Sequence, residues 1–216
     1  MPVMNFKAAV FDLDGTLIDS LGVWEKIDHD FLEKKRGIPL PDDYVDVIAP
    51  MTFAETAVYT RERFGLSETP QQLMDEWTEM SIYEYSNNIR LKSGVHEYLR
   101  RLKNDGVKIA LCTSSPSFLY ESVLKNNGIY DYFDSFTGTC EIGKGKTEPD
   151  VYIFAAEKTG VPVHDCMAFE DVLEAARSAA AAKMAVCGVY DDRGRAYVDE
   201  MKKICSLYIR SFEELL

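Results

Sequence analysis

The chain has 216 residues, and its content of 46% hydrophobic and 12% aromatic residues excludes an intrinsically disordered protein and allows a sizeable core. Its 24 basic against 36 acidic side chains give a formal net charge of -12, which argues against nucleic acid or an anionic membrane as a partner. No apolar run approaches the roughly 18 residues of a membrane span, so we expect no membrane-spanning segment.

The first predicted element is a short buried strand, KAAVFDLD (7–14), that ends in two acids. Because side chains alternate along a strand, Asp12 and Asp14 should share one side while Leu13 faces the other way. Removing unpaired carboxylates from water is costly, so a core strand that ends in two of them needs a compensating cation.

After this strand, residues 20–89 hold no convincing strand pattern and predict a helical insert. We therefore expect a core of residues 1–16 and 90–216 that is interrupted by a helical segment, 17–89. The helices expected in this segment lie near 20–36, 41–49, 53–65 and 70–86.

Capping boxes mark two of these helix starts. Thr52 pairs with Glu55 in the first box. Thr69 pairs with Gln72 in the second, where Pro70 occupies the first helical position. In such a box, two side chains satisfy backbone N–H groups that the first turn of a helix leaves unpaired.

The rest of the chain alternates predicted strands with predicted helices. The strands are expected at 108–114, 135–139, 166–171, 185–191 and 206–212. The helices are expected at 93–105, 116–127, 149–159, 172–183 and 194–203. This alternation predicts an α/β fold, a Rossmann-like parallel sheet with helices on both faces.

Polar residues gather where the predicted strands end. At the ends of strands one, two and four stand Asp12, Asp14, Thr113, Ser114, Glu170 and Asp171. Ligands of open parallel sheets bind at this edge, and acids that converge there need a cation among them. Oxygen ligands without histidine or thiolate favour a hard ion, and Mg²⁺ fits best. Helix capping on a solvated rim remains the structural alternative for each single residue.

Two further features favour phosphate chemistry. Ser115 and Pro116 begin a helix whose free N–H groups attract an anion, directly after the hydroxyls of Thr113 and Ser114. A lysine in GKGKTEPD (143–150) adds a fixed positive charge before another helix.

The sequence GKGKT (143–147) also resembles the end of a nucleotide-binding P-loop, GxxxxGK[ST]. In one register the first glycine should stand at position 140, where the chain has Cys140. In the other register a Ser or Thr should stand where the chain has Gly145. Both registers fail by one residue, so a nucleotide P-loop is not expected.

Four motifs in order resemble those of the haloacid dehalogenase superfamily. They are DLDGT (12–16), the hydroxyls at 113–114, the lysine of KTEPD (146–150) and FED (169–171). The helical insert after DLDGT resembles the first type of cap in that superfamily. The group of phosphoglycolate phosphatase and beta-phosphoglucomutase is the most similar. The resemblance covers the core motif by motif and the cap in architecture only.

The resemblance implies catalytic roles for the first two acids. Asp12 would be the nucleophile, attacking phosphorus to give an aspartyl-phosphate. Asp14 would protonate the leaving alcohol and then activate the hydrolytic water as a base.

The resemblance also implies a metal site and a phosphate site. Mg²⁺ would be held by Asp12, the backbone carbonyl of Asp14 and Asp171. Glu170 would be a second or water-mediated ligand. The phosphate site would consist of Thr113, the N–H of Ser114 and Lys146, with Lys144 as the alternative lysine.

Three positions depart from the family pattern. Val172 and Ala175 stand where a serine and a glycine often follow the fourth motif. The separate roles of Glu170 and Asp171 are therefore less defined. Thr147 replaces the usual proline after the lysine. By contrast, Asp14 is the acid that dehalogenases and phosphonatases lack, and it favours phosphate ester chemistry.

We therefore predict an Mg²⁺-dependent phosphatase, a phosphoric monoester hydrolase, that acts on a small phosphorylated metabolite. A sugar phosphomutase is the alternative, although Trp24 and Met51 stand near the places where such mutases carry cap cations. A phosphate-accepting signalling module is the non-enzymatic alternative.

The cysteines and the short N-terminal stretch bear on the cell compartment. Five widely spaced cysteines with no CxxC pair, and no signal-peptide core within residues 1–10, predict a reduced cytoplasmic protein. Nothing in the sequence requires more than a monomer.

Overall fold

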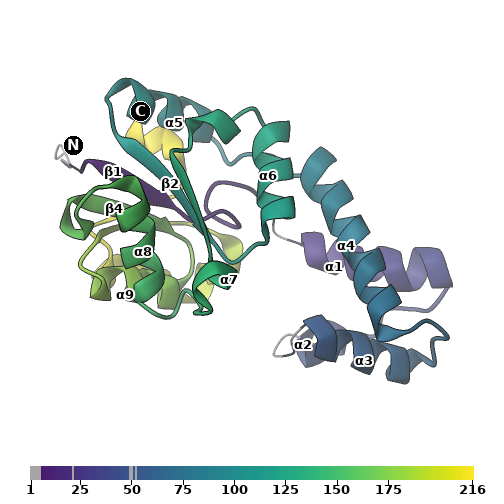
Figure 1. Cartoon of the computed structure of the whole chain (residues 1–216). Coiled ribbons are helices and arrows are strands. Elements are labelled where there is room, and N and C mark those ends of the chain that lie inside the picture. The colour runs from purple at the N-terminus through teal and green to yellow at the C-terminus, as the bar shows by residue number, and fades with distance from the viewer. Residues whose placement is uncertain (1–5, 21, 49–50, 52) are drawn as a thin grey trace. The chain divides into compact units, whose positions relative to one another are not determined.

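The computed structural model describes residues 6–20, 22–48, 51 and 53–216, which belong to two compact units. The helical unit is Gly22–Asn88, and the sheet unit combines Met1–Leu21 with Ile89–Leu216. Figure 1 shows that the strands belong to the sheet unit and that α1 to α4 make up the helical unit.

The described residues of the sheet unit form a six-stranded parallel sheet in the order β3-β2-β1-β4-β5-β6. This confirms the predicted α/β fold and each predicted strand. The strands are shorter than predicted at their carboxyl ends, where the chain leaves the sheet ladder for loops or, after β3, for helix α7 (Thr139–Ile142). They are β1 Ala8–Phe11, β2 Lys108–Thr113, β3 Ser135–Gly138, β4 Cys166–Glu170, β5 Ala185–Val189 and β6 Leu207–Ile209.

The register of the sheet brings the predicted site residues together. The last residue of β1, Phe11, pairs with Leu111 in β2 and with Phe169 in β4. Beyond this point the N–H of Asp12 still donates to the carbonyl of Phe169, at 3.0 Å. The carboxyl ends of β1, β2 and β4 therefore meet at one edge of the sheet.

Helices cover both faces of the sheet (Figure 1). The helices are α5 Val95–Asn104, α6 Ser117–Asn126, α7 Thr139–Ile142, α8 Asp150–Thr159, α9 Leu173–Ala181 and α10 Val198–Ile204. Short 3₁₀ turns lie at Tyr130–Tyr132, Val163–Asp165, Asp192–Tyr197 and Phe212–Leu215. All five predicted helices are confirmed, whereas the one-turn helix α7 was not predicted because it lies inside the expected loop after β3.

The two faces of the sheet bury different side chains. On one face, small residues such as Val10 and Ala168 pack with residues of α8 and α9. On the other face, Phe11 stacks on Phe169 with ring centroids 4.4 Å apart, and Tyr98 of α5 and Phe212 pack against this pair. Each fully buried phenylalanine stabilises the folded state by about 2–3 kcal/mol.

The residues of the helical unit that the structure describes form four α-helices, as the sequence predicts. They are α1 Val23–His29, continued by a π-helical turn at Asp30–Lys34, then α2 Tyr44–Ile48, α3 Phe53–Phe64 and α4 Pro70–Asn87. The capping box of Thr69 and Gln72 is present, with Pro70 in the first turn of α4. The other predicted cap, Thr52, lies outside the described residues.

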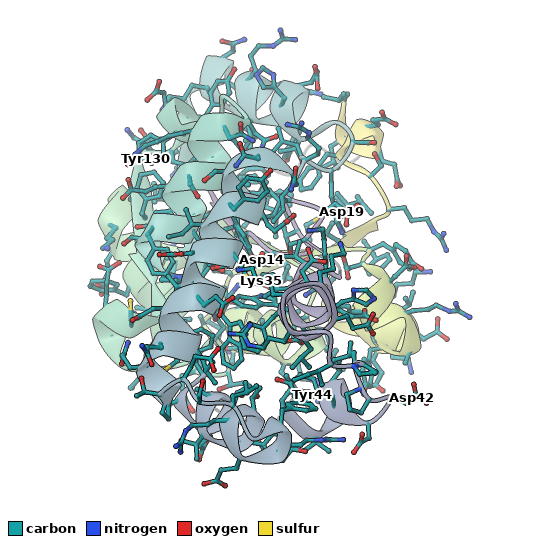
Figure 2. All side chains as sticks on the ribbon, turned by 90° about the vertical axis from the view of Figure 1, so that its right-hand side faces the viewer. Asp14, Asp19, Lys35, Asp42, Tyr44 and Tyr130 are labelled. Atoms are coloured by element: carbon teal, nitrogen blue, oxygen red, sulfur yellow. The ribbon has the colours of Figure 1, made fainter. Side chains whose placement is uncertain are left out.

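Buried aromatic residues hold the helical unit together. Trp77 of α4 packs on Phe31, with ring centroids 5.1 Å apart. Tyr44 of α2 is fully buried, and its hydroxyl lies 2.7 Å from Oγ1 of Thr60 in α3 (Figure 2). In the part of the chain that is described, no helix combines the length and the apolar character needed to cross a membrane.

The two segments that lead to and from the helical unit pair with each other inside the sheet unit. Asp19 N–H donates to the carbonyl of Arg90, and Lys92 N–H donates to the carbonyl of Leu17, both at 2.9 Å. These bonds fix the positions at which the chain leaves and re-enters the sheet unit.

The start of α5 depends on a glycine, and replacing it should destabilise the sheet unit. Gly94 has φ +80°, and a Cβ there would lie 2.5 Å from the backbone nitrogen of Glu213. Gly106 has φ +74°, but a Cβ there meets no described atom within 4 Å. We expect Gly106→Ala to lower the free energy of unfolding by about 1 kcal/mol through backbone strain alone. Gly94→Ala should cost at least about 2 kcal/mol more, because backbone atoms must move. Equal losses in urea denaturation would contradict the role of this contact.

Candidate active site

The loop after β1 places two carboxylates at the carboxyl edge of the sheet. Asp12 is buried at the end of the strand. Asp14 lies two residues further, and its Oδ2 accepts a hydrogen bond from Ser115 Oγ at 2.6 Å. Gly15 follows with φ +86°, and a Cβ there would lie 2.2 Å from Oδ2 of Asp171. A glycine is therefore required for both the turn and the approach of Asp171.

A lysine whose side chain is 11% exposed lies between two of the acids. Lys146 Nζ is 2.6 Å from Oδ1 of Asp12, and it also contacts Oε1 of Glu170. Burial opposes the charge of Lys146, but the charges of Asp12 and Glu170 outweigh burial and raise its pKa. Lys144, the alternative, forms an exposed ion pair with Asp150 at 2.7 Å. The structure thus brings Lys146, and not Lys144, to the acids.

Three buried acids form a compact cluster. Asp12, Glu170 and Asp171 each offer a carboxylate oxygen, and these oxygens lie within 4.8 Å of one another. Burial raises the pKa of Glu170 to about 8, although Lys146 acts in the opposite direction. Burial and then the charge of Asp12 raise the pKa of Asp171 to about 7. Thr16 Oγ1 donates to Oδ1 of Asp171 at 3.2 Å and orients this carboxylate.

The cluster fits a hard divalent cation. All its donors are carboxylate oxygens, the type that Mg²⁺ prefers. The second oxygen of Glu170, Oε2, is buried and has no hydrogen-bond partner among the residues that the structure describes. Since a buried polar atom without a partner is unfavourable, a cation bound by Asp12, Glu170 and Asp171 would satisfy this oxygen.

The two hydroxyl residues at the end of β2, Thr113 in the strand and Ser114 after it, line a cavity of about 370 Å³. Thr113 is buried, and its Oγ1 accepts a hydrogen bond from the N–H of Ser115 at 3.0 Å. Ser114 is exposed. The cavity is lined by Asp12, Asp14, Thr113, Ser114, Gly145, Lys146, Thr147, Glu170, Val172, Glu174, Ala175 and Arg193. It therefore gathers both catalytic candidates, all three phosphate-site candidates and Glu170.

Sequence reasoning missed an arginine that also lines this cavity. Arg193 Nη2 lies 3.8 Å from Oδ2 of Asp171, and its Nε donates to Oδ1 of Asp191 at 3.1 Å. Lys92 Nζ donates to the other oxygen of Asp191 at 3.0 Å. The signal that could have found Arg193 is DDRGR (191–195), which follows strand five at the same sheet edge.

The helical unit carries an exposed aromatic pair. Trp24 and Phe53 are 45% and 43% exposed and meet edge to face, with ring centroids 6.4 Å apart. Phe53 also contacts the buried Trp77. The pair is thus continuous with the core of the unit and yet open to solvent.

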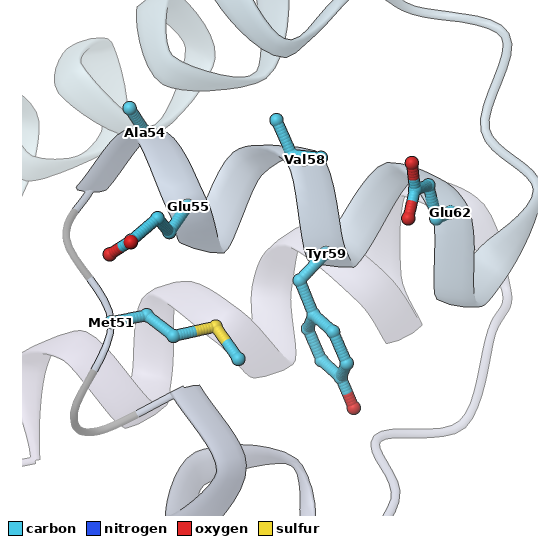
Figure 3. A pocket seen from close by; sticks show the side chains of 6 residues that line it. All are labelled: Met51, Ala54, Glu55, Val58, Tyr59 and Glu62. Atoms are coloured by element: carbon cyan, nitrogen blue, oxygen red, sulfur yellow. The ribbon is translucent and has the colours of Figure 1, made fainter.

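Met51 belongs to a different hollow of the helical unit. This hollow of about 570 Å³ is lined by Met51, Ala54, Glu55, Val58, Tyr59 and Glu62. Figure 3 shows the side chain of Met51 and the ring of Tyr59 on the same side of α3. The described lining contains two acids and no cationic side chain.

Comparisons with known proteins show the family of the chain. A family model described as haloacid dehalogenase-like hydrolase matches residues 6–183. Hexitol phosphatase B of Escherichia coli is 28% identical over 185 residues, which cover 82% of this chain and 80% of that protein. The beta-phosphoglucomutase of Bacillus subtilis is 28% identical over 199 residues, covering 85% and 83%. The solved structure of CbbY from Rhodobacter sphaeroides in complex with phosphate has a TM-score of 0.77 at 19% identity, covering 97% and 96%.

The raised pKa values predict a pH-dependent affinity for a divalent cation. Without metal, Glu170 and Asp171 retain protons to about pH 8 and about pH 7, and a cation must displace these protons. Affinity for Mg²⁺ should therefore fall as the pH is lowered, by at least about 10-fold between about pH 8.5 and about pH 6. Isothermal titration calorimetry in two buffers of different ionisation enthalpy would measure both the affinity and the released protons. A dissociation constant that does not change with pH would contradict this view of the cluster.

Proposed function

The chain belongs to the haloacid dehalogenase-like hydrolases, and we propose that it is an Mg²⁺-dependent phosphatase that hydrolyses a small phosphorylated metabolite through an aspartyl-phosphate. One observation carries the proposal. A single cavity holds Asp12 beside the buried cation of Lys146, and Asp14 hydrogen-bonded to Ser115. These are the parts that nucleophilic attack on a phosphate monoester requires.

Asp12 is suited to the role of nucleophile. One of its oxygens is held by Lys146, which restrains the side chain and leaves the other oxygen for attack on phosphorus. The new bond joins Asp12 to the phosphoryl group, and the bond from phosphorus to the leaving alcohol breaks. Lys146 also balances negative charge that gathers on the phosphoryl oxygens.

Asp14 is suited to proton transfer. Its Oδ2 accepts the hydrogen bond of Ser115, which orients the carboxyl group at the cavity. Asp14 would give its proton to the leaving alkoxide, then take a proton from the water that attacks phosphorus in the second step. That second attack breaks the phosphate away from Asp12, and it restores the carboxylate of Asp12 and the protonated carboxyl group of Asp14.

The remaining candidates would bind the phosphoryl group and the cation. Thr113 and the N–H of Ser114 would hold phosphoryl oxygens at the start of α6. Asp12, Glu170 and Asp171, with the backbone carbonyl of Asp14, would hold Mg²⁺. When bound, this ion neutralises charge on nucleophile and phosphate. The donor set of the cluster and the unpartnered oxygen of Glu170 support this assignment.

The related proteins support a sugar phosphate or a similar small metabolite as the substrate. Two of them are named as a hexitol phosphatase and a beta-phosphoglucomutase. The second name keeps a sugar phosphomutase as the alternative function. A mutase must hold a second phosphate, and the positions where we expected its cap cations carry Trp24 and Met51. This favours hydrolysis. The family match favours an enzyme over a phosphate-accepting signalling module.

We further propose that the helical unit acts as a cap that selects the leaving group. It is inserted into the sheet unit after the first catalytic loop, so two chain segments connect it. The exposed pair of Trp24 and Phe53 offers an apolar surface for the part of the substrate that is not transferred.

Replacing the nucleophile should abolish turnover without unfolding the protein. Asp12→Asn should lower hydrolysis of p-nitrophenyl phosphate by at least about 1000-fold, because an amide cannot form the aspartyl-phosphate. Asp131→Asn, which changes an exposed acid of the sheet unit, is the control and should leave turnover unchanged. Reduction of the wild-type intermediate with borohydride should convert Asp12 to homoserine, which peptide mass spectrometry detects.

Two outcomes would contradict this assignment. Retention of a tenth of wild-type turnover by Asp12→Asn would remove Asp12 from the nucleophilic role. Homoserine at another aspartate would move the covalent step elsewhere. Undiminished activity in EDTA would separately contradict the role of Mg²⁺.

The aromatic pair should affect substrate choice more than chemistry. Trp24→Ala and Phe53→Ala should change the ratio of kcat/KM between phosphorylated metabolites by about 10-fold, as expected when a few contacts worth about 1–3 kcal/mol are lost. Activity on p-nitrophenyl phosphate should fall much less. Val45→Ala, an exposed apolar position on α2, is the control. If all substrates suffer equally and the melting temperature falls, the pair only packs the helical unit.

A further inference from the structure

We propose that Tyr152 is a positioning residue for the metal site, holding Glu170 so that one carboxylate oxygen is directed to the cation. The inference rests on the proposed function, because it concerns the ligand set that we assign to Mg²⁺. Neither the sequence motifs nor the family match gives this tyrosine a role.

Two donors share one oxygen of Glu170. Tyr152 is 1% exposed, and its hydroxyl donates to Oε1 of Glu170 at 2.6 Å. Lys146 contacts the same oxygen. The other oxygen, Oε2, is buried and lacks a hydrogen-bond partner within the described part of the chain. Among the described residues, Oε1 therefore contacts two donors, whereas Oε2 contacts none.

This asymmetry fixes the orientation of the carboxylate. Two contacts on Oε1, one with the hydroxyl of Tyr152 and one with the ammonium group of Lys146, resist rotation of the carboxyl group about its terminal bond. Glu170 also offers an oxygen to the cluster with Asp12 and Asp171, whose ligand atoms lie within 4.8 Å of one another. With Oε1 occupied, Oε2 is the oxygen with capacity to bind a cation.

Both donors come from the start of α8. Lys146 lies in the loop before this helix, and Tyr152 lies in its first turn with the ring centroid 5.9 Å from Lys146 Nζ. The tyrosine ring packs in the core with small residues such as Val10 and Ala168. A phenylalanine would fill this core equally well, so packing alone does not require the hydroxyl.

The hydroxyl of Tyr152 acts as the donor in this bond, because a phenol keeps its proton at neutral pH. A buried hydroxyl and a buried carboxylate each lose hydration on folding, and their mutual hydrogen bond compensates for part of this loss.

The test is Mg²⁺ binding to the full chain without substrate. Tyr152→Phe should raise the dissociation constant for Mg²⁺ by about 10-fold. This is the lower end of the effect expected when a residue that orients a metal ligand is removed. Tyr98→Phe removes the hydroxyl of a buried tyrosine on the opposite face of the sheet and should leave this constant unchanged. At saturating Mg²⁺, the KM of Tyr152→Phe for p-nitrophenyl phosphate should match that of the wild type.

A double-mutant cycle separates positioning from general damage. Glu170→Gln alone and the double variant with Tyr152→Phe should bind Mg²⁺ equally, because the tyrosine then has no carboxylate to orient. The double variant lacks both the hydroxyl of Tyr152 and the carboxylate of Glu170, so it shows whether the two side chains act on Mg²⁺ binding through each other.

The outcomes distinguish this inference from the proposed function. If the wild type binds Mg²⁺ and Tyr152→Phe binds it equally well, Tyr152 has no positioning role and the proposed function stands. If Tyr152→Phe weakens binding to the same extent with and without Glu170, the effect does not act through Glu170 and the inference fails. If the wild type binds no Mg²⁺, both the metal assignment and the inference fail.

Discussion

The structure depends on the attraction between one buried ammonium group and the carboxylates around it. Asp12, Glu170 and Asp171 converge at the edge of a sheet whose interior is almost wholly apolar. Charges of one sign at this spacing in a dry environment would destabilise the fold. Lys146 lies between Asp12 and Glu170 and reduces that repulsion. The position of α8, whose start carries Lys146, is therefore tied to the position of β1 and β4.

Much of the fold could be predicted because its signals are local in the sequence. The apolar strands, the turns between them and the cap of Thr69 on α4 each follow from a few adjacent residues. The convergence of Asp12 with Glu170 was also predictable, since parallel strands present their carboxyl ends at one edge. The motif KTEPD favoured Lys146 over Lys144, and tertiary packing separates the two lysines, because Lys146 contacts Asp12 and Glu170 whereas Lys144 pairs with Asp150.

The residues that sequence reasoning missed are those whose role depends on packing. Tyr152 has the spacing of a core residue on α8, and the sequence does not show that its hydroxyl donates to Glu170 of β4 in the folded protein. Arg193 lies in a 3₁₀ turn with no periodic pattern, and its contact with Asp171 crosses from β5 to β4. In the helical unit, the π-helical turn after α1 likewise has no sequence signature, although all four helices do.

Lys146 acts as a counter-ion within the chain, and this affects whether folding needs a metal ion. In small zinc domains, folding waits for the metal, because the unliganded thiolates have nothing else to balance them. Here Lys146 already supplies a positive charge to Asp12 and Glu170, so these side chains have a counter-ion before any metal binds. If the site binds Mg²⁺ as proposed, binding of the metal would be a late, reversible step governed by the free concentration of the ion. A newly made molecule and one that has lost its metal would share the same fold. Each could bind the metal ion from solution without unfolding.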